Sequence, residues 1–238
     1  MNIILIGYGK MGKTIEEIAV ERGHNISQKI DADNLADFTK QKLQTADVAI
    51  EFTHPESAYG NISNCLTFGL PVVSGTTGWT EKLDEIKTKC KKLNGTMLYA
   101  SNFSVGVNIF FEINSLLASL MDKQKEYDVS LEETHHTQKK DAPSGTAITL
   151  AEQILERISR KTKWINHLSD NQEELEIISE RKDPAPGTHK VKYSSSIDDI
   201  EIIHTAHSRK GFALGAVLAA EFIAGRKGVF TMKDVLGL

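Results

Sequence analysis

The stretch that decides the fold lies at the N-terminus, where residues 2–12 read Asn-Ile-Ile-Leu-Ile-Gly-Tyr-Gly-Lys-Met-Gly. Residues 3–6 form a short apolar run, so residues 2–6 are typical of a buried strand. The glycines follow the pattern G-x-G-x-x-G, and residues 10–22 then have the composition of a helix. A strand, a glycine turn and a helix in this order predict a dinucleotide-binding unit, whereas the simpler alternative is a structural turn.

Each glycine of this loop has a physical purpose in such a unit. Gly7 permits the tight turn, Gly9 lets a pyrophosphate approach the backbone, and Gly12 allows the helix to pack closely on the strand. The phosphates would bind free N–H groups at the N-terminus of the helix. The pattern also needs an acidic residue about 20 positions on, and Asp31 follows the predicted strand at residues 25–30. We therefore expect the cofactor to contact Gly7, Tyr8, Gly9, Lys10, Met11, Gly12 and Asp31.

The rest of the chain divides into two parts that differ in the spacing of their apolar residues. Up to about residue 100, apolar runs at 48–52, 70–74 and 96–100 alternate with helical stretches. This alternation predicts βαβ units and a parallel sheet. Beyond about residue 125, four stretches alternate with a period of two, which predicts half-buried strands of an open sheet with one face covered. Residues 161–173 are expected to form a loop, and residues 212–224 an apolar helix that packs back on the first domain.

Composition places the chain among ordinary globular proteins. It has 238 residues, of which 40% are hydrophobic and 25% are charged, and its net charge is −4. Mild acidity argues against nucleic acid as the main partner. The N-terminal apolar run is too short for a signal peptide or a membrane span, so no membrane partner is expected. The two cysteines, Cys65 and Cys90, are too few for a disulfide framework, and a reducing, cytoplasmic setting is expected.

The segment richest in chemistry is residues 133–146, which reads Glu-Thr-His-His-Thr-Gln-Lys-Lys-Asp-Ala-Pro-Ser-Gly-Thr. Its end has helix-starting residues, so the backbone N–H groups near Thr146 offer an anion site that suits a carboxylate. His135, His136 and Lys139 add positive charge and exchangeable protons, which general acid catalysis needs. The alternatives are a surface loop, a simple helix cap, or a metal site with Glu133 or Asp141. No further ligand is evident, so no metal is expected.

Together these residues resemble the dihydrodipicolinate reductase family of bacterial lysine and diaminopimelate synthesis. The resemblance runs nearly end to end, and the segment from His135 to Thr146 is its most specific motif. Other matching segments are Glu51-Phe-Thr53 with Pro55, Ser74-Gly-Thr-Thr-Gly78, Ala100-Ser-Asn-Phe-Ser-Val-Gly106, Ser179-Glu-Arg181, Gly187-Thr-His189, and His204-Thr-Ala-His-Ser-Arg209 followed by Phe212 and Gly215.

The resemblance implies an α/β fold with two domains. A Rossmann-type parallel-sheet domain for the dinucleotide would span residues 1–104 and 211–238. An α+β substrate and oligomerisation domain with an open mixed sheet would span residues 105–210 and would build a homotetramer. The implied reaction is the reduction of 4-hydroxy-tetrahydrodipicolinate, a small dicarboxylate, with NADH or NADPH or both.

The resemblance also implies roles for individual residues. His135 would be the acid/base residue and Lys139 the proton donor, while His136 and the amides of Gly145 and Thr146 would hold a substrate carboxylate. Further cofactor contacts would come from Phe52, Gly75, Thr76, Thr77, Ala100, Ser101, Asn102 and Phe103. The chain departs from the family at Ala32, where members that favour NADPH often have Arg, and at Thr137 and Gln138, where some have Arg and His.

Two other functions share parts of this pattern. Another NAD(P)-dependent dehydrogenase of a small acid would share the glycine loop without needing the segment from His135 to Thr146. A non-catalytic nucleotide-sensing module would bind the cofactor and leave His135 and Lys139 idle. The choice between NADH and NADPH depends on Asp31, which would accept hydrogen bonds from ribose hydroxyls and repel a 2′-phosphate. Lys10 would offset part of the charge of a 2′-phosphate, but Ala32 offers no guanidinium to bind it. We therefore expect NADH to be used at least as well as NADPH.

Overall fold

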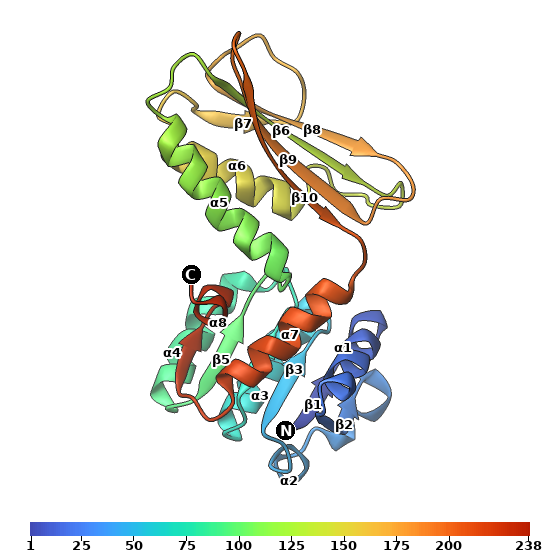
Figure 1. The fold of residues 1–238 in the computed structure, drawn as a ribbon. Helices are drawn as coiled ribbons and strands as arrows, with labels where there is room; N and C mark the ends of the chain where they lie inside the picture. The colour runs from blue at the N-terminus through green and yellow to red at the C-terminus, as the bar shows by residue number, and fades with distance from the viewer. The chain divides into compact units, whose positions relative to one another are not determined.

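The computed structural model describes all 238 residues, which fold into two compact units (Figure 1). The first unit contains residues 1–105 and 209–238, and the second contains residues 106–208. None of the helices is both long enough and apolar enough to span a bilayer.

The first unit is built on a six-stranded sheet with the order β11-β5-β4-β3-β1-β2. Every strand pair in it is parallel, as the sequence predicts. The strands are β1 (Asn2–Ile6), β2 (Asn25–Ile30), β3 (Val48–Glu51), β4 (Val72–Ser74), β5 (Thr96–Tyr99) and β11 (Gly228–Phe230). The helices are α1 (Lys10–Glu21), α2 (Lys40–Leu43), α3 (Pro55–Thr67), α4 (Leu83–Lys92), α7 (Lys210–Ile223) and α8 (Met232–Leu236), with 3₁₀ turns at Ala32–Asp37 and Thr80–Lys82.

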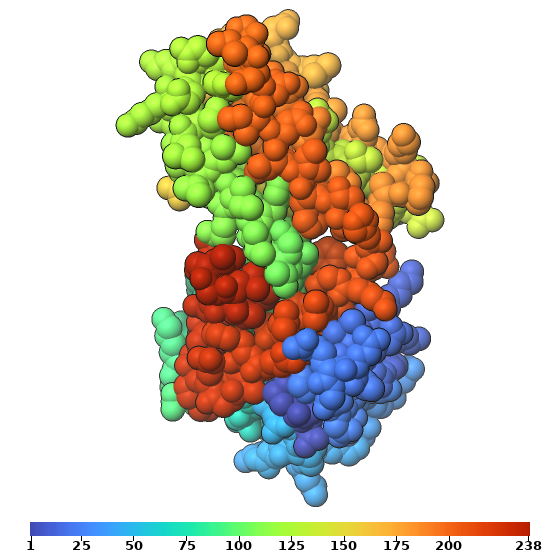
Figure 2. Space-filling view, in the orientation of Figure 1, coloured from blue at the N-terminus to red at the C-terminus, as the bar shows by residue number.

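Helices cover both faces of this sheet, which explains why the inner strands β1, β3 and β4 are buried along nearly their whole length. The edge strand β2 is buried only in part. In β1, Ile3 and Leu5 pack with α1 and α7, whereas Ile4 and Ile6 pack with α3 and α4. Successive side chains of a strand point to opposite faces, so every position of β1 after Asn2 is buried. Figure 2 shows the C-terminal residues, in orange and red, lying against the blue N-terminal residues in this unit. The predicted helix at 212–224 is confirmed as α7.

The second unit is a five-stranded mixed sheet with the order β10-β9-β6-β8-β7. Its strands are β6 (Asp128–His135), β7 (Lys163–Ile165), β8 (Glu174–Arg181), β9 (Gly187–Ser194) and β10 (Asp199–Ala206). The central strand β6 pairs in parallel with β8 and antiparallel with β9. Two helices, α5 (Val105–Met121) and α6 (Gly145–Arg157), pack on one face of the sheet, as Figure 1 shows. The predicted open sheet with one covered face is therefore confirmed.

Several elements differ from the sequence prediction. The expected loop at residues 161–173 contains the strand β7, so the sheet has five strands rather than four. Strand β11 and the helices α2, α5 and α8 were not predicted. Strand β11 has only three residues, too few to show a period. Helix α5 is apolar around most of its circumference, so its sequence lacks the stripe that marks an amphipathic helix.

Candidate active site

The glycine loop joins β1 to α1 in the geometry that a pyrophosphate requires. Gly7 has φ +91°, and a Cβ there would lie 2.0 Å from the carbonyl oxygen of Phe52. A Cβ on Gly12 would lie 2.3 Å from the carbonyl oxygen of Gly7, so both positions need glycine. Gly9 faces open space, with nothing within 4 Å of a Cβ, and it caps α1 without a side-chain hydrogen bond. The N-terminus of α1 is therefore open to an anion.

Asp31 directly follows β2 and lies beside this loop. Its Oδ2 accepts a hydrogen bond from the backbone N–H of Tyr8 at 3.3 Å, and its Oδ1 accepts one from Ala32 at 2.9 Å. The neighbouring Lys29 forms an ion pair with Glu16 at 2.7 Å and lies 4.5 Å from the centre of the Tyr8 ring. A carboxylate thus stands next to the glycine loop, while Lys29 is already neutralised by Glu16.

A buried carboxylate joins the ends of β3 and β4. Glu51 is fully buried and accepts hydrogen bonds from the hydroxyls of Ser74 at 2.6 Å and Thr76 at 2.9 Å, as well as from Thr53. The Thr76 hydroxyl in turn accepts a hydrogen bond from the backbone N–H of Thr53 at 2.8 Å. Four polar groups therefore hold the two loops together. The resemblance included Glu51 in a motif, but sequence reasoning gave it no role.

A cavity of about 290 Å³ lies in the first unit where these loops meet. Five of its lining residues are predicted cofactor contacts, namely Met11, Phe52, Gly75, Ser101 and Phe103. The Phe52 and Phe103 rings lie 5.6 Å apart, and a Cβ on Gly75 would lie 2.2 Å from the Phe52 ring. The predicted contacts Thr76, Thr77, Ala100 and Asn102 belong to the same loops without lining the cavity. Arg209 and Phe212 also line it, and sequence reasoning did not assign them to the cofactor.

This cavity and the open glycine loop fit a dinucleotide. The loops lie at the carboxyl ends of parallel strands, which is where sheets of this kind bind their ligands. A largely apolar, aromatic-walled cavity suits a flat ring, and the N-terminus of α1 suits the phosphates.

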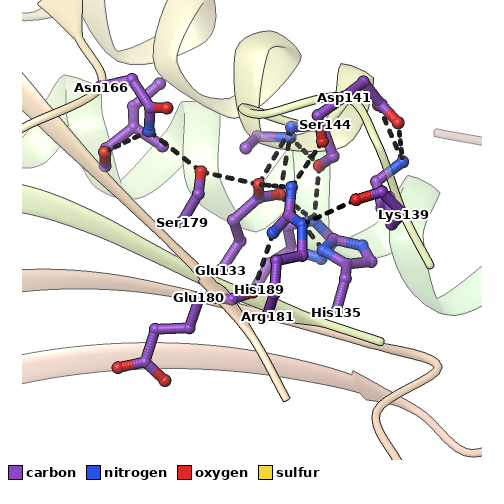
Figure 3. A network of polar contacts seen from close by, with 12 residues as sticks. Glu133, His135, Lys139, Asp141, Ser144, Asn166, Ser179, Glu180, Arg181 and His189 are labelled. Carbon is purple, nitrogen blue, oxygen red and sulfur yellow. Dashed lines mark hydrogen bonds and ion pairs between the residues drawn. The ribbon is translucent and has the colours of Figure 1, made fainter. Parts of the chain in front are cut away.

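In the second unit, Glu133 is the centre of a network of polar side chains (Figure 3). Its carboxylate is fully buried on the covered face of β6. It accepts hydrogen bonds from the backbone N–H of Ser144 at 3.1 and 3.2 Å, from the Ser179 hydroxyl at 2.8 Å and from the Arg181 guanidinium at 3.3 Å. Burial opposes ionisation, but hydrogen bonds from His189, Ser144 and Ser179 outweigh it and hold the pKa of Glu133 below its usual range.

His135 lies next to this carboxylate. Its Nδ1 is 3.4 Å from Oε2 of Glu133, and its ring is 5.0 Å from the His189 ring, nearly perpendicular to it. A Cβ on Gly187 would lie 3.1 Å from Nε2 of His135, so glycine leaves room for the ring. Burial lowers the pKa of His135 to about 4, although the Glu133 carboxylate raises it. The imidazole is therefore neutral at pH 7 when no ligand adds charge.

Lys139 lies in the loop that follows β6. Its ammonium forms an ion pair with both oxygens of Asp141, at 2.9 and 2.8 Å. In the same loop, the backbone N–H of Thr137 donates a hydrogen bond to the Asp183 carboxylate at 3.2 Å, and the Thr137 hydroxyl donates another. His136, half-buried, follows the last residue of β6. The loop that carries His136 and Lys139 is thus held at the end of the sheet.

Helix α6 begins beside this loop. The Ser144 hydroxyl caps it by accepting a hydrogen bond from Ala147 at 3.2 Å, and it lies 3.1 Å from Nε2 of His189. Gly145 and Thr146 are the first two residues of α6, so their N–H groups lie at the end of the helix where the macrodipole is positive. The structure therefore brings the start of α6 next to the Glu133 network and His135, as the sequence leads one to expect.

Three ligand-type side chains in this network also lie close enough to hold a metal. Glu133, His135 and His189 each offer a ligand atom, and these atoms lie within 4.8 Å of one another. However, the carboxylate already accepts several hydrogen bonds, and a guanidinium 3.3 Å from it repels a cation. These contacts disfavour a metal, and the expectation that none is bound stays a prediction.

Comparisons with known proteins agree with this arrangement. Two family models match the chain: "Dihydrodipicolinate reductase, N-terminus" over residues 1–103 and "Dihydrodipicolinate reductase, C-terminus" over residues 106–236. A 4-hydroxy-tetrahydrodipicolinate reductase of Christiangramia forsetii is 52% identical over 99% of this chain and 98% of its own length. One from Lawsonia intracellularis is 33% identical, with 99% of each chain covered.

The fold has a solved counterpart. A dipicolinate-bound dihydrodipicolinate reductase from Paenisporosarcina sp. TG-14 superposes with a TM-score of 0.81 over 98% of each chain, at 22% identity. Because both family models and the curated relatives agree over the full length, the chain belongs to the dihydrodipicolinate reductase family and is an NAD(P)H-dependent oxidoreductase that reduces 4-hydroxy-tetrahydrodipicolinate in lysine and diaminopimelate biosynthesis.

Proposed function

We propose that the polar network of the second unit binds the dicarboxylate substrate and supplies the proton of this reduction, while the loops of the first unit bind the dinucleotide. The observation that carries this proposal is that His135, Ser144 at the start of α6 and Arg181 all contact one buried carboxylate, Glu133. Arg181 also donates a hydrogen bond to the backbone carbonyl of Lys139, which places the loop of Lys139 beside the same network. The segment from His135 to Thr146 thus forms one site rather than a surface loop.

The substrate is held by charge and by backbone dipoles. The first N–H groups of α6, at Gly145 and Thr146, and the side chain of His136 bind one carboxylate. A carboxylate is stabilised at a helix N-terminus because the macrodipole places partial positive charge there. The ammonium of Lys139 and the guanidinium of Arg181 add positive potential for a dianion.

Proton delivery is the task of Lys139 and His135. When bound, NAD(P)H supplies the hydride, the substrate ring also gains a proton, and the 4-hydroxyl group is lost as water. A hydride and its acceptor must approach to about 3–3.5 Å, so substrate and cofactor must be held in a reactive geometry. His135 is neutral without substrate, but negative charges within about 4–6 Å favour the protonated imidazole. Substrate binding therefore favours protonation of His135.

Calorimetry on the wild-type protein tests this step. Dipicolinate, the dicarboxylate in the solved Paenisporosarcina structure, is titrated in two buffers of different ionisation enthalpy at neutral pH. The proposal predicts that binding takes up protons in the wild type, and less in His135→Asn. Dipicolinate binding without proton uptake would contradict the proposed protonation of His135.

We further propose that the enzyme is a cytoplasmic homotetramer whose second units form the interface. The support is an unpaired edge strand, β10, that exposes Ile200 and Ile203 on a sheet whose other face is uncovered by helices. Both cysteines are free thiols buried in the first unit, which suits a reducing compartment. Light scattering should give four times the chain mass, and Ile203→Lys should reduce the assembly.

A further inference from the structure

We propose that Glu133 is a positioning residue of the reaction, whose buried carboxylate holds His135, His189 and the start of α6 in one arrangement and keeps a negative charge beside the His135 ring. This inference rests on the proposed role of His135. Glu133 contacts His135 and Ser144, but the proposed function gives its carboxylate no part in binding or proton transfer.

The strand register places the Glu133 side chain between those of Ser179 and His189 on the neighbouring strands. Glu133 on β6 pairs with Ser179 on β8 and with His189 on β9. Paired residues of neighbouring strands point to the same face, so all three side chains lie together on the face that α6 covers. The next inward position, His135, pairs with Arg181. The residue between them, Thr134, points to the opposite face.

The contacts of Glu133 tie four elements together. It receives hydrogen bonds from Ser144 at the start of α6 and from Ser179 and Arg181 on β8, and it lies 3.6 Å from Nε2 of His189 on β9. The Ser144 hydroxyl lies within hydrogen-bonding distance of the same His189 nitrogen, at 3.1 Å, and so connects α6 to β9. Any change at Glu133 therefore reaches the carboxylate-binding end of α6 and the His135 ring at once.

Packing alone does not call for a carboxylate at this position. Replacing a buried ion pair by apolar residues is often neutral or stabilising, whereas removing one partner is costly. The groups that face His135 are Glu133 on its own strand, His189, Arg181 and Lys139. Of these, only Glu133 is negative, so its charge is the one that favours the imidazolium which proton transfer requires.

The test compares Glu133→Gln with Glu132→Gln in the full-length enzyme. Glutamine keeps the shape and the hydrogen-bond acceptor but removes the charge. Glu132 is the matched control because it lies one position away, on the exposed face, and pairs with Lys190 at 2.8 Å. The turnover number kcat is measured against pH with saturating NADH and enzymatically generated substrate, and the pKa of His135 is followed by NMR.

We expect Glu133→Gln to lower kcat by about tenfold or more while the KM for NADH stays unchanged. Without the carboxylate the pKa of His135 falls, so the alkaline limb of the kcat profile should move to lower pH by about one unit. Glu132→Gln should match the wild type. A lower kcat with an unmoved limb and an unmoved His135 pKa would show a purely structural role and overturn the proposal.

Two further variants separate the possible failures. Glu133→Asp keeps the negative charge, so the alkaline limb of its kcat profile should stay at the wild-type pH even if kcat falls. A displaced limb in Glu133→Asp would contradict the proposal. This variant therefore tests the proposal even if Glu133→Gln does not fold. His135→Ala tests the proposed function itself. Full turnover in His135→Ala would remove the role on which this inference rests, whereas loss there with wild-type behaviour of Glu133→Gln would overturn the inference alone.

Discussion

At the residue scale, the proposed proton transfer depends on two basic side chains that lie beside carboxylates. His135 lies beside Glu133, and Lys139 is paired with Asp141. In the proposed function, each basic group exchanges a proton next to the start of α6, where the substrate carboxylate is proposed to bind. Their contributions to the rate can be separated from cofactor binding because both belong to the second unit.

We therefore expect Lys139→Ala and His135→Ala to lower kcat by roughly 100- to 10,000-fold, the usual contribution of a general acid or base. The dissociation constant for NADH, measured by fluorescence titration, should stay close to that of the wild type. Lys140→Ala is the matched control, since Lys140 is the exposed neighbour in the same loop. Near-wild-type turnover in both variants would show that the assigned roles are wrong.

The proposed carboxylate contact of Thr146 gives a second prediction. A hydrogen bond to a charged group contributes about 1.5–3 kcal/mol, so Thr146→Val should raise the KM for the substrate about tenfold or more. Thr149→Val, one turn further along α6, should leave this KM unchanged because its hydroxyl bonds to the carbonyl of Gly145. An unchanged KM in a folded Thr146→Val would remove Thr146 from the site.

Cofactor choice also belongs to single residues. Asp31 lies beside the glycine loop, Ala32 offers no guanidinium, and Lys29 is paired with Glu16. A 2′-phosphate would therefore meet a carboxylate without the bidentate clamp that Arg provides. We expect kcat/KM with NADH to be at least as high as with NADPH at matched ionic strength. If NADPH were strongly preferred, Lys10→Ala should abolish that preference, since Lys10 is the exposed cation of the loop.

The sequence could identify most of these residues but not Glu133. The motif from His135 to Thr146 is continuous, so its members are found without knowing the fold. The alternation of residues in β6 already places Glu133 on the covered face and Glu132 on the other. The groups that contact the Glu133 carboxylate come from β8, β9 and α6, and only the folded chain brings them together. Arg209 and Phe212 reach the cofactor cavity from a distant part of the chain, which no local pattern reveals.

At the scale of elements, close approaches of backbone set the cofactor site. Helix α7 packs against the loop after β5, and a Cβ on Gly215 would lie 1.7 Å from the carbonyl oxygen of Phe103. That contact fixes the loop that lines the cavity. Phe103 in turn lies against Phe52, so a shift of α7 would change the aromatic wall.

We expect Gly215→Ala to destabilise the protein by about 1–3 kcal/mol, the usual cost of overpacking, and to raise the KM for NADH. Gly60→Ala is the control, since Gly60 lies on the exposed side of α3 with nothing within 4 Å. There alanine should stabilise by about 0.5–1 kcal/mol through its higher helix propensity. Urea unfolding measures both changes, and equal stabilities for the two variants would contradict the packing argument.

Element prediction succeeded where burial leaves a pattern in the sequence. Apolar runs that alternate with helical stretches predict the parallel sheet, and a period of two predicts four strands of the second unit. Strand β7 and strand β11 have three residues each, and their pairing with β8 and β5 is what makes them strands. Helix α5 was not predicted because its own apolar residues lie around most of its circumference and leave no amphipathic stripe.

At the scale of the whole molecule, one chain combines a parallel-sheet unit of the NAD(P)-binding type with a mixed-sheet unit that carries the proposed dicarboxylate site. The chain enters the second unit after residue 105 and returns to the first at residue 209, where α7 covers the face of the sheet beside α1. The first unit is therefore completed only when the C-terminal residues have been made. This arrangement links the two binding sites through a single polypeptide.

The most direct measurement is the fall in NADH absorbance when the purified protein meets enzymatically generated 4-hydroxy-tetrahydrodipicolinate. The account predicts that NADH is oxidised in equimolar amount to the substrate, that dipicolinate inhibits the reaction, and that the Lys139→Ala, His135→Ala double variant binds NADH without oxidising it. Equal NADH oxidation by the wild type and the double variant, or none by the wild type, would contradict it.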